Sequence, residues 1–417
     1  MSRINRRRFR VGVLATHPIQ YYAPWYRGLA EHCDLEVFFS HRQTADGQAA
    51  AGFGVPFDWD IPLLDGYKSR FLHNTARTPD VGRFWGCVTP DIRDVIRRTR
   101  FDVFIVHGWS TASYWQAIRA CWSTRTPVLV RGDSNLATPR SWIWRSLKRP
   151  AYRWFIPRFD GYLIVGTRAR EYVMSYGADA SRCFETPHAV DNEFFASRSD
   201  ELRRDRTATR ARFGLPAAGA AFLFAGRFID RKQPLLFVRA LKAAATSVPG
   251  VSGLMVGDGP LRQAAESLTA QLDAPIRFAG FLNQTEMAAA YTACDAVVVP
   301  SDWETWGLIV NEAMACGLPA IVTDGVACAG DLVESGVTGE ICSVGAVGAV
   351  ADAIGRLAGD SEYRSSLSMN ARRHVARFDV AAAVAGTLRA VEHVASRNPV
   401  NTALPAPALN ATSVGRR

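Results

Sequence analysis

Two carboxylates in the second half of the chain have a spacing that suits a sugar nucleotide. Glu304 and Glu312 lie eight residues apart in the string PSDWETWGLIVNEAMACGLP, which runs from residue 300 to residue 319. Gly307 and the apolar run after it predict a loop that leads into a helix. Because carboxylates accept hydrogen bonds from hydroxyls, Glu304 on the loop could hold a sugar ring while Glu312, about two helical turns further on, holds a ribose.

A glycine and two basic residues lie at the end of another predicted strand. Residues 221–225 are apolar, Gly226 and Arg227 follow at once, and Lys232 lies five positions after Arg227 at the start of a predicted helix. A glycine lets a phosphate approach the backbone, and the two cations can neutralise a diphosphate. The pattern suits a pyrophosphate leaving group, but it also occurs in ordinary surface turns, and alone it leaves both interpretations open.

Two parallel sheets are needed to position these residues. Short apolar runs alternate with amphipathic segments in two successive series, which predicts an α/β fold with two doubly wound sheets. The predicted strands are residues 11–15, 35–39, 103–106, 128–130 and 162–165 in the first series, and 221–225, 253–256, 276–279, 296–299 and 320–323 in the second. A chain of 417 residues is too long for one ordinary core, so two domains are expected. Strand ends in such sheets face a ligand crevice.

The string around Glu304 and Glu312, with the basic turn upstream, closely resembles the E-x7-E signature of glycosyltransferase family 4 (group 1), the retaining glycosyltransferases of the GT-B fold. The resemblance continues through residues 256–261, 281–282, 290–296, 323–325, 330–333 and 339, and in the first half through residues 165–168 and 187–195. It implies two Rossmann-like domains that face each other across a cleft.

The resemblance also implies roles for particular residues. In that family the counterparts of Arg227 and Lys232 bind the donor diphosphate, that of Glu304 contacts the donor sugar, and that of Glu312 binds the ribose hydroxyls. The donor-binding set expected here is Gly226, Arg227, Lys232, Glu304, Thr305, Trp306, Gly307, Leu308 and Glu312. No metal or other cofactor is expected beyond the nucleoside diphosphate sugar, because cations and helix N-termini stabilise the departing phosphate.

The first half matches the family pattern less closely. Its first loop lacks the usual glycines, and His17 and Gln20 in that loop could contact phosphate or acceptor hydroxyls or could belong to a turn that merely packs. Later predicted strands end at His107 and at Arg131 with Asp133. We therefore take His17, Gln20 and Arg131 as candidate substrate-binding residues. His107 and Asp133 join Glu304, Arg227 and Lys232 as candidate catalytic residues, with the choice between His107 and Asp133 left open.

Domain boundaries follow from composition and from the resemblance. A charged stretch with few large apolar residues, 196–212, marks the connection between the halves. We predict an N-terminal acceptor-binding domain over residues 1–198 and a C-terminal nucleotide-sugar-binding domain over 199–378. A helix break near residue 378 resembles the point where the family's last helix, here 379–397, returns to the N-terminal domain. The polar segment 398–417 is expected to be a disordered tail.

Composition narrows the partners and the compartment. The eight cysteines stand singly, without CxxC pairs, which argues against a metal cluster and a disulfide framework and fits a reducing cytoplasm. No apolar run is long enough for a membrane span, so a soluble protein is predicted. The formal charge of +10 would suit a polyanion, but no nucleic-acid-binding motif is visible. Most of the short basic runs, among them residues 145–153 and 203–212, are interpreted as solvated helix faces.

These observations predict a retaining hexosyltransferase that moves a sugar from a nucleoside diphosphate sugar to a hydroxyl acceptor. The expected setting is the synthesis of bacterial cell-surface polysaccharide, lipopolysaccharide or glycolipid. Trp142, Trp144 and Trp154 among arginines would suit a lipid-linked acceptor and an anionic membrane surface at the inner face of the cell membrane. Two alternatives stay open: a GT-B epimerase or sugar-phosphate synthase, and a non-catalytic sugar-nucleotide-binding protein of an assembly complex. The nucleotide base, the donor sugar, the acceptor, the linkage and the oligomeric state are not determined by the sequence.

Overall fold

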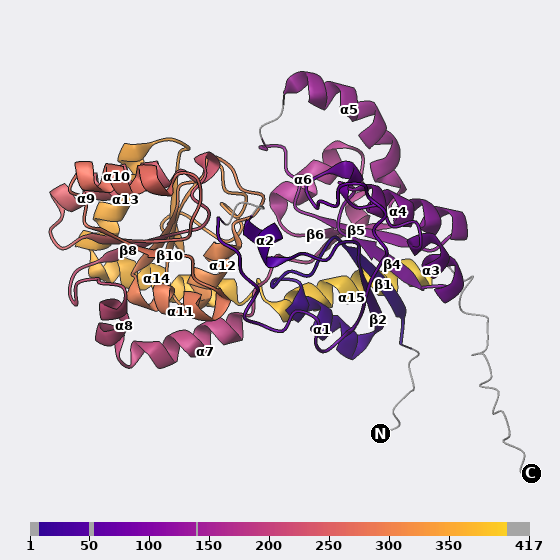
Figure 1. The fold of residues 1–417 in the computed structure, drawn as a ribbon, viewed down its shortest axis with the longest axis horizontal. Helices are drawn as coiled ribbons and strands as arrows, with labels where there is room; N and C mark the ends of the chain where they lie inside the picture. The colour runs from indigo at the N-terminus through magenta and orange to yellow at the C-terminus, as the bar shows by residue number, and fades with distance from the viewer. Residues whose placement is uncertain (1–7, 50–53, 139–140, 398–417) are drawn as a thin grey trace, which may run out of the picture.

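The computed structural model describes residues 8–49, 54–138 and 141–397 of the chain, which form two α/β halves, each around one parallel sheet (Figure 1). The prediction of two doubly wound sheets is confirmed. In Figure 1 the first half lies on the right in indigo and purple, and the second half lies on the left in pink and orange. The predicted tail, 398–417, lies outside the described residues.

The first sheet has the strand order β3-β2-β1-β4-β5-β6-β7 within the described residues, and every pairing is parallel. Its strands are β1 (Arg10–Ala15), β2 (Asp34–Phe39), β3 (Lys68–Phe71), β4 (Val103–Val106), β5 (Val128–Gly132), β6 (Gly161–Ile164) and β7 (Cys183–Glu185). The helices of this half are α1 (Ala23–His32), α2 (Ala45–Gln48), α3 (Ile92–Thr99), α4 (Ala112–Thr124), α5 (Trp142–Phe155) and α6 (Thr167–Ser175), with short 3-10 turns η2 (Phe84–Gly86), η3 (Ile156–Arg158) and η4 (Ala180–Arg182).

The second sheet has the order β10-β9-β8-β11-β12-β13 in the part of the chain that the structure describes, again with every pairing parallel. Its strands are β8 (Ala221–Ala225), β9 (Ser252–Val256), β10 (Ile276–Gly280), β11 (Ala296–Val299), β12 (Ala320–Thr323) and β13 (Gly339–Cys342). The remaining helices are α7 (Asn192–Arg203), α8 (Arg206–Arg212), α9 (Pro234–Ser247), α10 (Arg262–Gln271), α11 (Gln284–Ala293), α12 (Leu308–Ala315), α13 (Val347–Gly359), α14 (Ser361–Val375) and α15 (Val380–Ser396), with the 3-10 turn η5 (Asp230–Lys232).

Alternation along the strands explains why both sheets are covered on both faces. In β1, Val11 and Val13 pack in a cluster with residues of α1 and α15, whereas Leu14 packs in the opposite cluster with residues of α3 and α4. Successive side chains of a strand point to opposite faces, and a parallel sheet with helices on both sides buries both sets. The central strand β11 is accordingly a run of buried alanine and valine.

The chain crosses between the halves twice, at two adjacent points. It leaves the first sheet after β7 and enters α7, which packs against α11 and α12 of the second half. It returns through α15, which lies beside α1 and against β6 and β7 (Figure 1). A parallel bridge between Val190 and Asp379 joins the two crossings. The predicted boundary between residues 198 and 199 falls inside α7.

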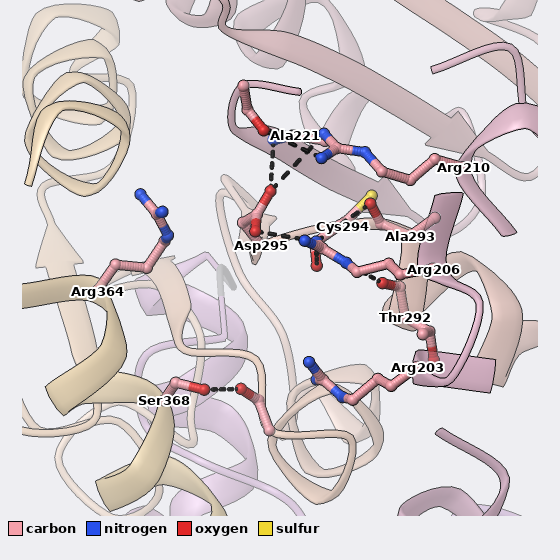
Figure 2. Close-up of polar contacts among 12 residues, drawn as sticks. Arg203, Arg206, Arg210, Ala221, Thr292, Ala293, Cys294, Asp295, Arg364 and Ser368 are labelled. Atoms are coloured by element: carbon pink, nitrogen blue, oxygen red, sulfur yellow. Dashed lines mark hydrogen bonds and ion pairs between the residues drawn. The ribbon is translucent and has the colours of Figure 1, made fainter. Parts of the chain in front are cut away.

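Two arginines of the run 203–212 that precedes the second sheet, Arg206 and Arg210, do not belong to a solvated helix face, and that interpretation is corrected for these two, whereas Arg204 and Arg212 are exposed. Arg206 donates to the carbonyl of Cys294 and to Asp295, both at 2.9 Å, while the buried Arg210 lies beside the same carboxylate (Figure 2). Asp295 also accepts from the backbone N–H of Ala221 at 2.8 Å (Figure 2). The open carbonyls at the end of α11 need donors, which Arg206 supplies, while Arg210 donates to the carbonyl of Gly219 just before β8.

Candidate functional site

A cavity of about 410 Å³ lies between the two halves, at the carboxyl ends of their strands. The first half contributes residues from the loops after β1, β2, β5 and β7, and the second half those after β8, β9, β10 and β11. The residues used below that line it are Gln20, Tyr21, Tyr22, Trp59, Asp133, His188, Gly226, Arg227, Arg231, Lys232, Phe281, Glu304, Thr305, Trp306, Gly307, Leu308 and Glu312. The nine residues predicted to contact the donor are all among them.

Two glycine turns form one side of the cavity. Gly226, after β8, has a φ of +149°, and Gly257, after β9, has a φ of +124°. A Cβ atom on Gly257 would lie 2.0 Å from the carbonyl oxygen of Gly226, so only glycine allows the two turns to pack this closely. Both glycines also line the cavity, so a ligand can approach their backbone without meeting a side chain at either position. Such an opening suits a phosphate group.

Lys232 and Glu304 form a buried ion pair at this wall. The Lys232 Nζ pairs with Glu304 Oε1, and the hydroxyl of Ser301 donates to the same oxygen at 3.0 Å. The side chains of Lys232 and Glu304 are 16% and 9% exposed. Burial lowers the pKa of Lys232, while the nearby carboxylate opposes that shift. Each partner thus holds the other in place. Because the charge of Lys232 is paired with Glu304, Arg227 and Arg231 supply the positive charge at this wall of the cavity.

Arg227 is half-buried and faces the cavity beside Arg231. Burial, followed by the repulsion of Arg231, lowers the pKa of the Arg227 guanidinium, and Glu304 acts in the opposite direction. Guanidinium groups stay charged under such shifts and bind phosphate oxygens in pairs. Two arginines beside glycine turns can therefore bind a diphosphate.

Glu312 lies on the first turns of α12 and joins the two halves through hydrogen bonds. The carboxylate is 5% exposed and accepts from the hydroxyl of Tyr291 at 2.5 Å. Burial raises the pKa of Glu312 to about 7, against the opposing effect of hydrogen bonds from Tyr291 and from Tyr21 of the first half. A carboxyl group with this pKa can accept hydrogen bonds from hydroxyls once it is ionised.

The loop between the two glutamates is held by its own packing. Gly307 has a φ of +103°, and a Cβ atom there would lie 2.9 Å from a methyl group of Val326. Trp306 is 3% exposed, and its indole N–H donates to Asn311 at 2.8 Å. The amide of Asn311 donates in turn to the backbone carbonyl of His188 at 3.1 Å. The loop is thus fastened to residues 186–191, which lead from β7 to α7 where the chain crosses between the halves. We call residues 186–191 the crossing segment.

Among the first-half residues predicted for the site, the structure places Gln20 and Asp133 at the cavity but not His17, His107 or Arg131. His107 contacts the ring of Tyr22, with centroids 4.4 Å apart, and its Nε2 lies 3.1 Å from the hydroxyl of Tyr26. Burial and Arg131 lower the pKa of His107 to about 3. His107 thus lies behind Tyr22, which lines the cavity and packs against the imidazole, and its catalytic role stays a prediction.

Arg131 and His17, predicted to bind substrate, also lie behind the residues that line the cavity, and their substrate-binding roles stay predictions. Arg131 is 3% exposed and donates to the backbone carbonyls of Thr186 at 2.7 Å and Pro187 at 3.3 Å. Its guanidinium supports the crossing segment, whose buried carbonyls need donors. His17 bonds to Thr16, and burial with the nearby His41 lowers the pKa of His17 to about 4.

His188 is a cavity residue that the sequence analysis did not select. It is 5% exposed, and its Nε2 lies 4.0 Å from Asp133 Oδ2 without a hydrogen-bond partner among the described residues. Burial, followed by Arg131 and His107, lowers its pKa well below the usual value. One sequence signal could have identified His188: it follows the last strand of the first sheet by three residues, where the chain crosses into the second half.

The segment over residues 54–65, which has no helix or strand, reaches the second half. Asp60 Oδ2 accepts from the backbone N–H of Thr285 at 3.2 Å and from its hydroxyl, and Asn283 donates to the carbonyl of Asp58 at 2.8 Å. Trp59 lines the cavity between these contacts. We call residues 54–65 the strap. It joins the first half to the N-terminus of α11.

The comparisons with known proteins cover both halves. Residues 26–194 match the family model described as Glycosyltransferase Family 4, and residues 205–374 match the one described as Glycosyl transferases group 1. The chain therefore belongs to glycosyltransferase family 4 (group 1), as the resemblance implied.

Relatives with known names agree with this family. The D-inositol 3-phosphate glycosyltransferase of Mycobacterium tuberculosis H37Rv is 35% identical over 234 residues, which are 52% of this chain and 45% of the relative. The enzyme of the same name from Mycobacterium bovis AF2122/97 gives the same values. The matched region thus spans less than half the length of these curated relatives.

Solved structures share the fold. The Anabaena protein Alr3699/HepE, solved with UDP and glucose, has a TM-score of 0.66 and 17% identity, with 92% of this chain and 99% of that chain covered. Sucrose-phosphate synthase from Thermosynechococcus elongatus has a TM-score of 0.68 and 19% identity, with 94% and 100% covered. The predicted GT-B fold is confirmed.

The described residues contain no group of three or more His, Cys, Asp or Glu side chains placed to hold a metal ion. In the same residues, no helix combines the length and the apolar character needed to cross a bilayer.

Proposed function

We propose that the protein is a retaining glycosyltransferase that moves a hexose from a nucleoside diphosphate sugar to a hydroxyl acceptor. The observation that carries this proposal is the convergence of Arg227, Lys232, Glu304 and Glu312 on one cavity between the two halves. The diphosphate would lie at the glycine turns beside Arg227, the ribose at Glu312, and the sugar between Glu304 and the first half. UDP in the solved structure of the Anabaena protein supports a nucleotide donor.

The chemistry follows from where charge develops. The bond between the anomeric carbon and the diphosphate oxygen breaks, its electron pair goes to the phosphate, and the acceptor oxygen forms the new bond. With retention, the leaving and incoming oxygens lie on the same face of the ring, so the departing phosphate oxygen can take the acceptor proton. Arg227 and Arg231 would stabilise the growing negative charge, and fixed charges in a site closed to water are effective at this. We therefore propose that no metal is needed.

The test is a transfer assay followed by NMR of the product. UDP-, GDP-, ADP- and dTDP-sugars are incubated with a panel of acceptors that includes inositol 3-phosphate and a lipid-linked saccharide, with and without EDTA. We expect a product that keeps the anomeric configuration of the donor and forms equally well with EDTA. Conversion of the donor without any acceptor would favour an epimerase, and binding without turnover would favour a non-catalytic role. Inversion or loss of activity in EDTA would contradict the mechanism.

Helix α5 supports a further part of the proposal, which is docking at an anionic membrane. Trp142 is 75% exposed, Leu147 is 65% exposed and Trp154 is 54% exposed, and the helix contains Lys148 and Arg149 but no acidic residue. Figure 1 shows α5 projecting from the outer edge of the first half. Basic helices with exposed tryptophans bind at lipid headgroups. We propose that α5 holds the protein at the inner face of the cell membrane for synthesis of cell-surface polysaccharide or glycolipid.

Vesicle sedimentation tests this docking. Binding to vesicles rich in anionic lipid at low salt, with release at high salt, is the expected result. Trp142→Ser with Leu147→Ser should reduce binding at least severalfold, and Lys148→Glu with Arg149→Glu should abolish it. Trp85→Ser is the matched control, because Trp85 is 71% exposed but lies outside α5. Equal binding by all variants, or none by the wild type, would exclude docking through α5.

A further inference from the structure

His188 and Asp133 form an incomplete hydrogen-bonding pair at the cavity. The two atoms that face each other, His188 Nε2 and Asp133 Oδ2, are 4.0 Å apart, which is too long for a direct hydrogen bond. The His188 Nε2 is buried and has no hydrogen-bond partner among the described residues. A buried polar atom without a hydrogen-bond partner costs stability. When such an atom faces a cavity, a bound ligand can supply the missing partner.

Both halves of the molecule hold His188 in this position. Its backbone carbonyl accepts from Asn311 of α12, and its ring lies 5.8 Å from that of Trp306. On the other side, Arg131 donates to the carbonyl of the preceding Pro187. The imidazole is therefore fixed before any ligand binds, which reduces the entropic cost of using it. Deep burial beside Trp306 also places it next to the donor-binding loop rather than at the cavity mouth.

The charges around the pair favour a neutral hydroxyl over a phosphate. Arg131 and His107 lie near the imidazole, and with burial they keep it uncharged at neutral pH. A neutral imidazole adds no charge that attracts an anion, and the Asp133 carboxylate offsets the positive charge of the nearby buried Arg131. A hydroxyl can accept one hydrogen bond and donate another, and one oxygen with two arms of about 2.8 Å can span the 4.0 Å between the side chains.

We propose that His188 and Asp133 bind one hydroxyl of the transferred sugar between them. His188 Nε2–H donates to the hydroxyl oxygen, and the hydroxyl donates to Asp133 Oδ2. Each wall of the cavity then binds a different part of the donor: the second half binds the diphosphate at Arg227, and the first half binds the sugar at His188. This inference rests on the proposed function, because it takes the cavity to be the donor site.

Titration calorimetry tests the pair with two ligands, a free nucleoside diphosphate and the sugar nucleotide that carries the same diphosphate. The nucleotide is the one among UDP, GDP, ADP and dTDP that most stabilises the wild type. His188→Phe keeps the ring volume without the polar atoms, and Asp133→Ala removes the carboxylate. We expect each to lower the affinity for the sugar nucleotide roughly tenfold or more, while the affinity for the free diphosphate changes less than about twofold.

Further variants separate a sugar contact from a structural role. His188→Gln should recover part of the lost preference for the sugar nucleotide, since its amide reaches the position of Nε2. The double variant of His188→Phe and Asp133→Ala should lose little more than either single variant, because both groups bind one hydroxyl. His32→Gln, at the far end of α1, is the control and should match the wild type.

Several results would overturn the inference. Equal losses for the free diphosphate and the sugar nucleotide would mean that His188 only supports the fold. Unchanged affinity for the sugar nucleotide with a higher KM for the acceptor would mean that His188 and Asp133 bind the acceptor rather than the donor sugar. Additive losses in the double variant would exclude a shared hydroxyl. Failure of the proposed function would look different, because the wild type would then bind none of the nucleotides.

Discussion

The wall of the cavity formed by the second half carries its functional groups on short turns, whereas the wall formed by the first half is assembled from distant residues. Gly226, Arg227 and Lys232 lie within seven positions of one another. Asp133 and His188 lie 55 positions apart and meet only through the fold. The wall of the second half, here the second wall, concentrates positive charge that suits a diphosphate, whereas the wall of the first half, the first wall, offers aromatic rings with His188 and Asp133 as hydrogen-bonding groups. One cavity thus presents unlike groups on opposite walls, which suits the unlike parts of a single ligand.

The largest effect should follow from breaking the ion pair of the second wall. Lys232→Met leaves the buried Glu304 without its cation, so we expect activity to fall about a thousandfold and stability to fall by roughly 2 kcal/mol. Kinetic assays and thermal unfolding measure the two losses.

The double variant of Lys232→Met and Glu304→Gln serves as the control. It should recover most of the stability, because neither member is then a lone buried charge, but none of the activity. Recovery of both would mean that the pair is structural and that the wall does not bind the donor through these residues.

A second prediction compares two arginines of the same half. Arg206→Ala removes donors from the end of α11 and from Asp295, and should cost roughly 2–3 kcal/mol of stability without changing the KM for the donor. Arg227→Ala should do the opposite, with little loss of stability and a large loss of donor affinity. Chemical denaturation and steady-state kinetics measure both. A large loss of stability in the Arg227→Ala single variant would contradict the distinction between Arg206 as a structural residue and Arg227 as a donor-binding residue.

Replacing Glu312 should weaken nucleotide binding but raise the stability of the protein above pH 7. Its folded-state pKa of about 7 lies above the unfolded value of about 4.3, so the stability it contributes is present at low pH and is lost as the pH rises through 7. Glu312→Gln should therefore gain stability relative to the wild type between pH 4 and pH 8, by roughly 3–4 kcal/mol. It should also bind nucleotide roughly tenfold more weakly.

Unfolding curves at pH 4, 6 and 8 provide the measurement for Glu312→Gln. Parallel pH profiles for the variant and the wild type would show that the carboxyl group does not titrate in this range. Glu193→Gln is a suitable control, because Glu193 is an exposed carboxylate of α7.

The smallest effect concerns the strap, which joins the walls. Asp60→Ala removes the acceptor of both Thr285 bonds, so the strap should be held less firmly against the second half and Trp59 should line the cavity less often. We expect roughly threefold weaker nucleotide binding and an unchanged kcat. Asp65→Ala, on the same segment, is the matched control. A loss of kcat without a change in affinity would place the strap in the transfer step instead.

The sequence predicted the second wall better than the first for a physical reason. Glycine turns and cations at strand ends are local, so spacing and strand prediction placed Gly226 and Arg227 at a strand end, and the family resemblance assigned them, with Glu312, to the donor. His107 follows β4 and Arg131 lies near the end of β5, yet their side chains contact partners that no spacing reveals, Tyr26 and the backbone carbonyl of Thr186. His188 is set by contacts from both halves. The strap contains no regular element, so hydrophobic periodicity gave no signal for its path.

Direct titration of the purified protein with nucleoside diphosphates tests the central claim most directly, namely that the second wall binds the donor diphosphate. The account predicts that at least one of UDP, GDP, ADP and dTDP binds the wild type, that Arg227→Ala weakens that binding at least tenfold, and that Arg239→Ala, an exposed arginine on α9, does not. Equal binding by the Arg227→Ala variant and the wild type would contradict it.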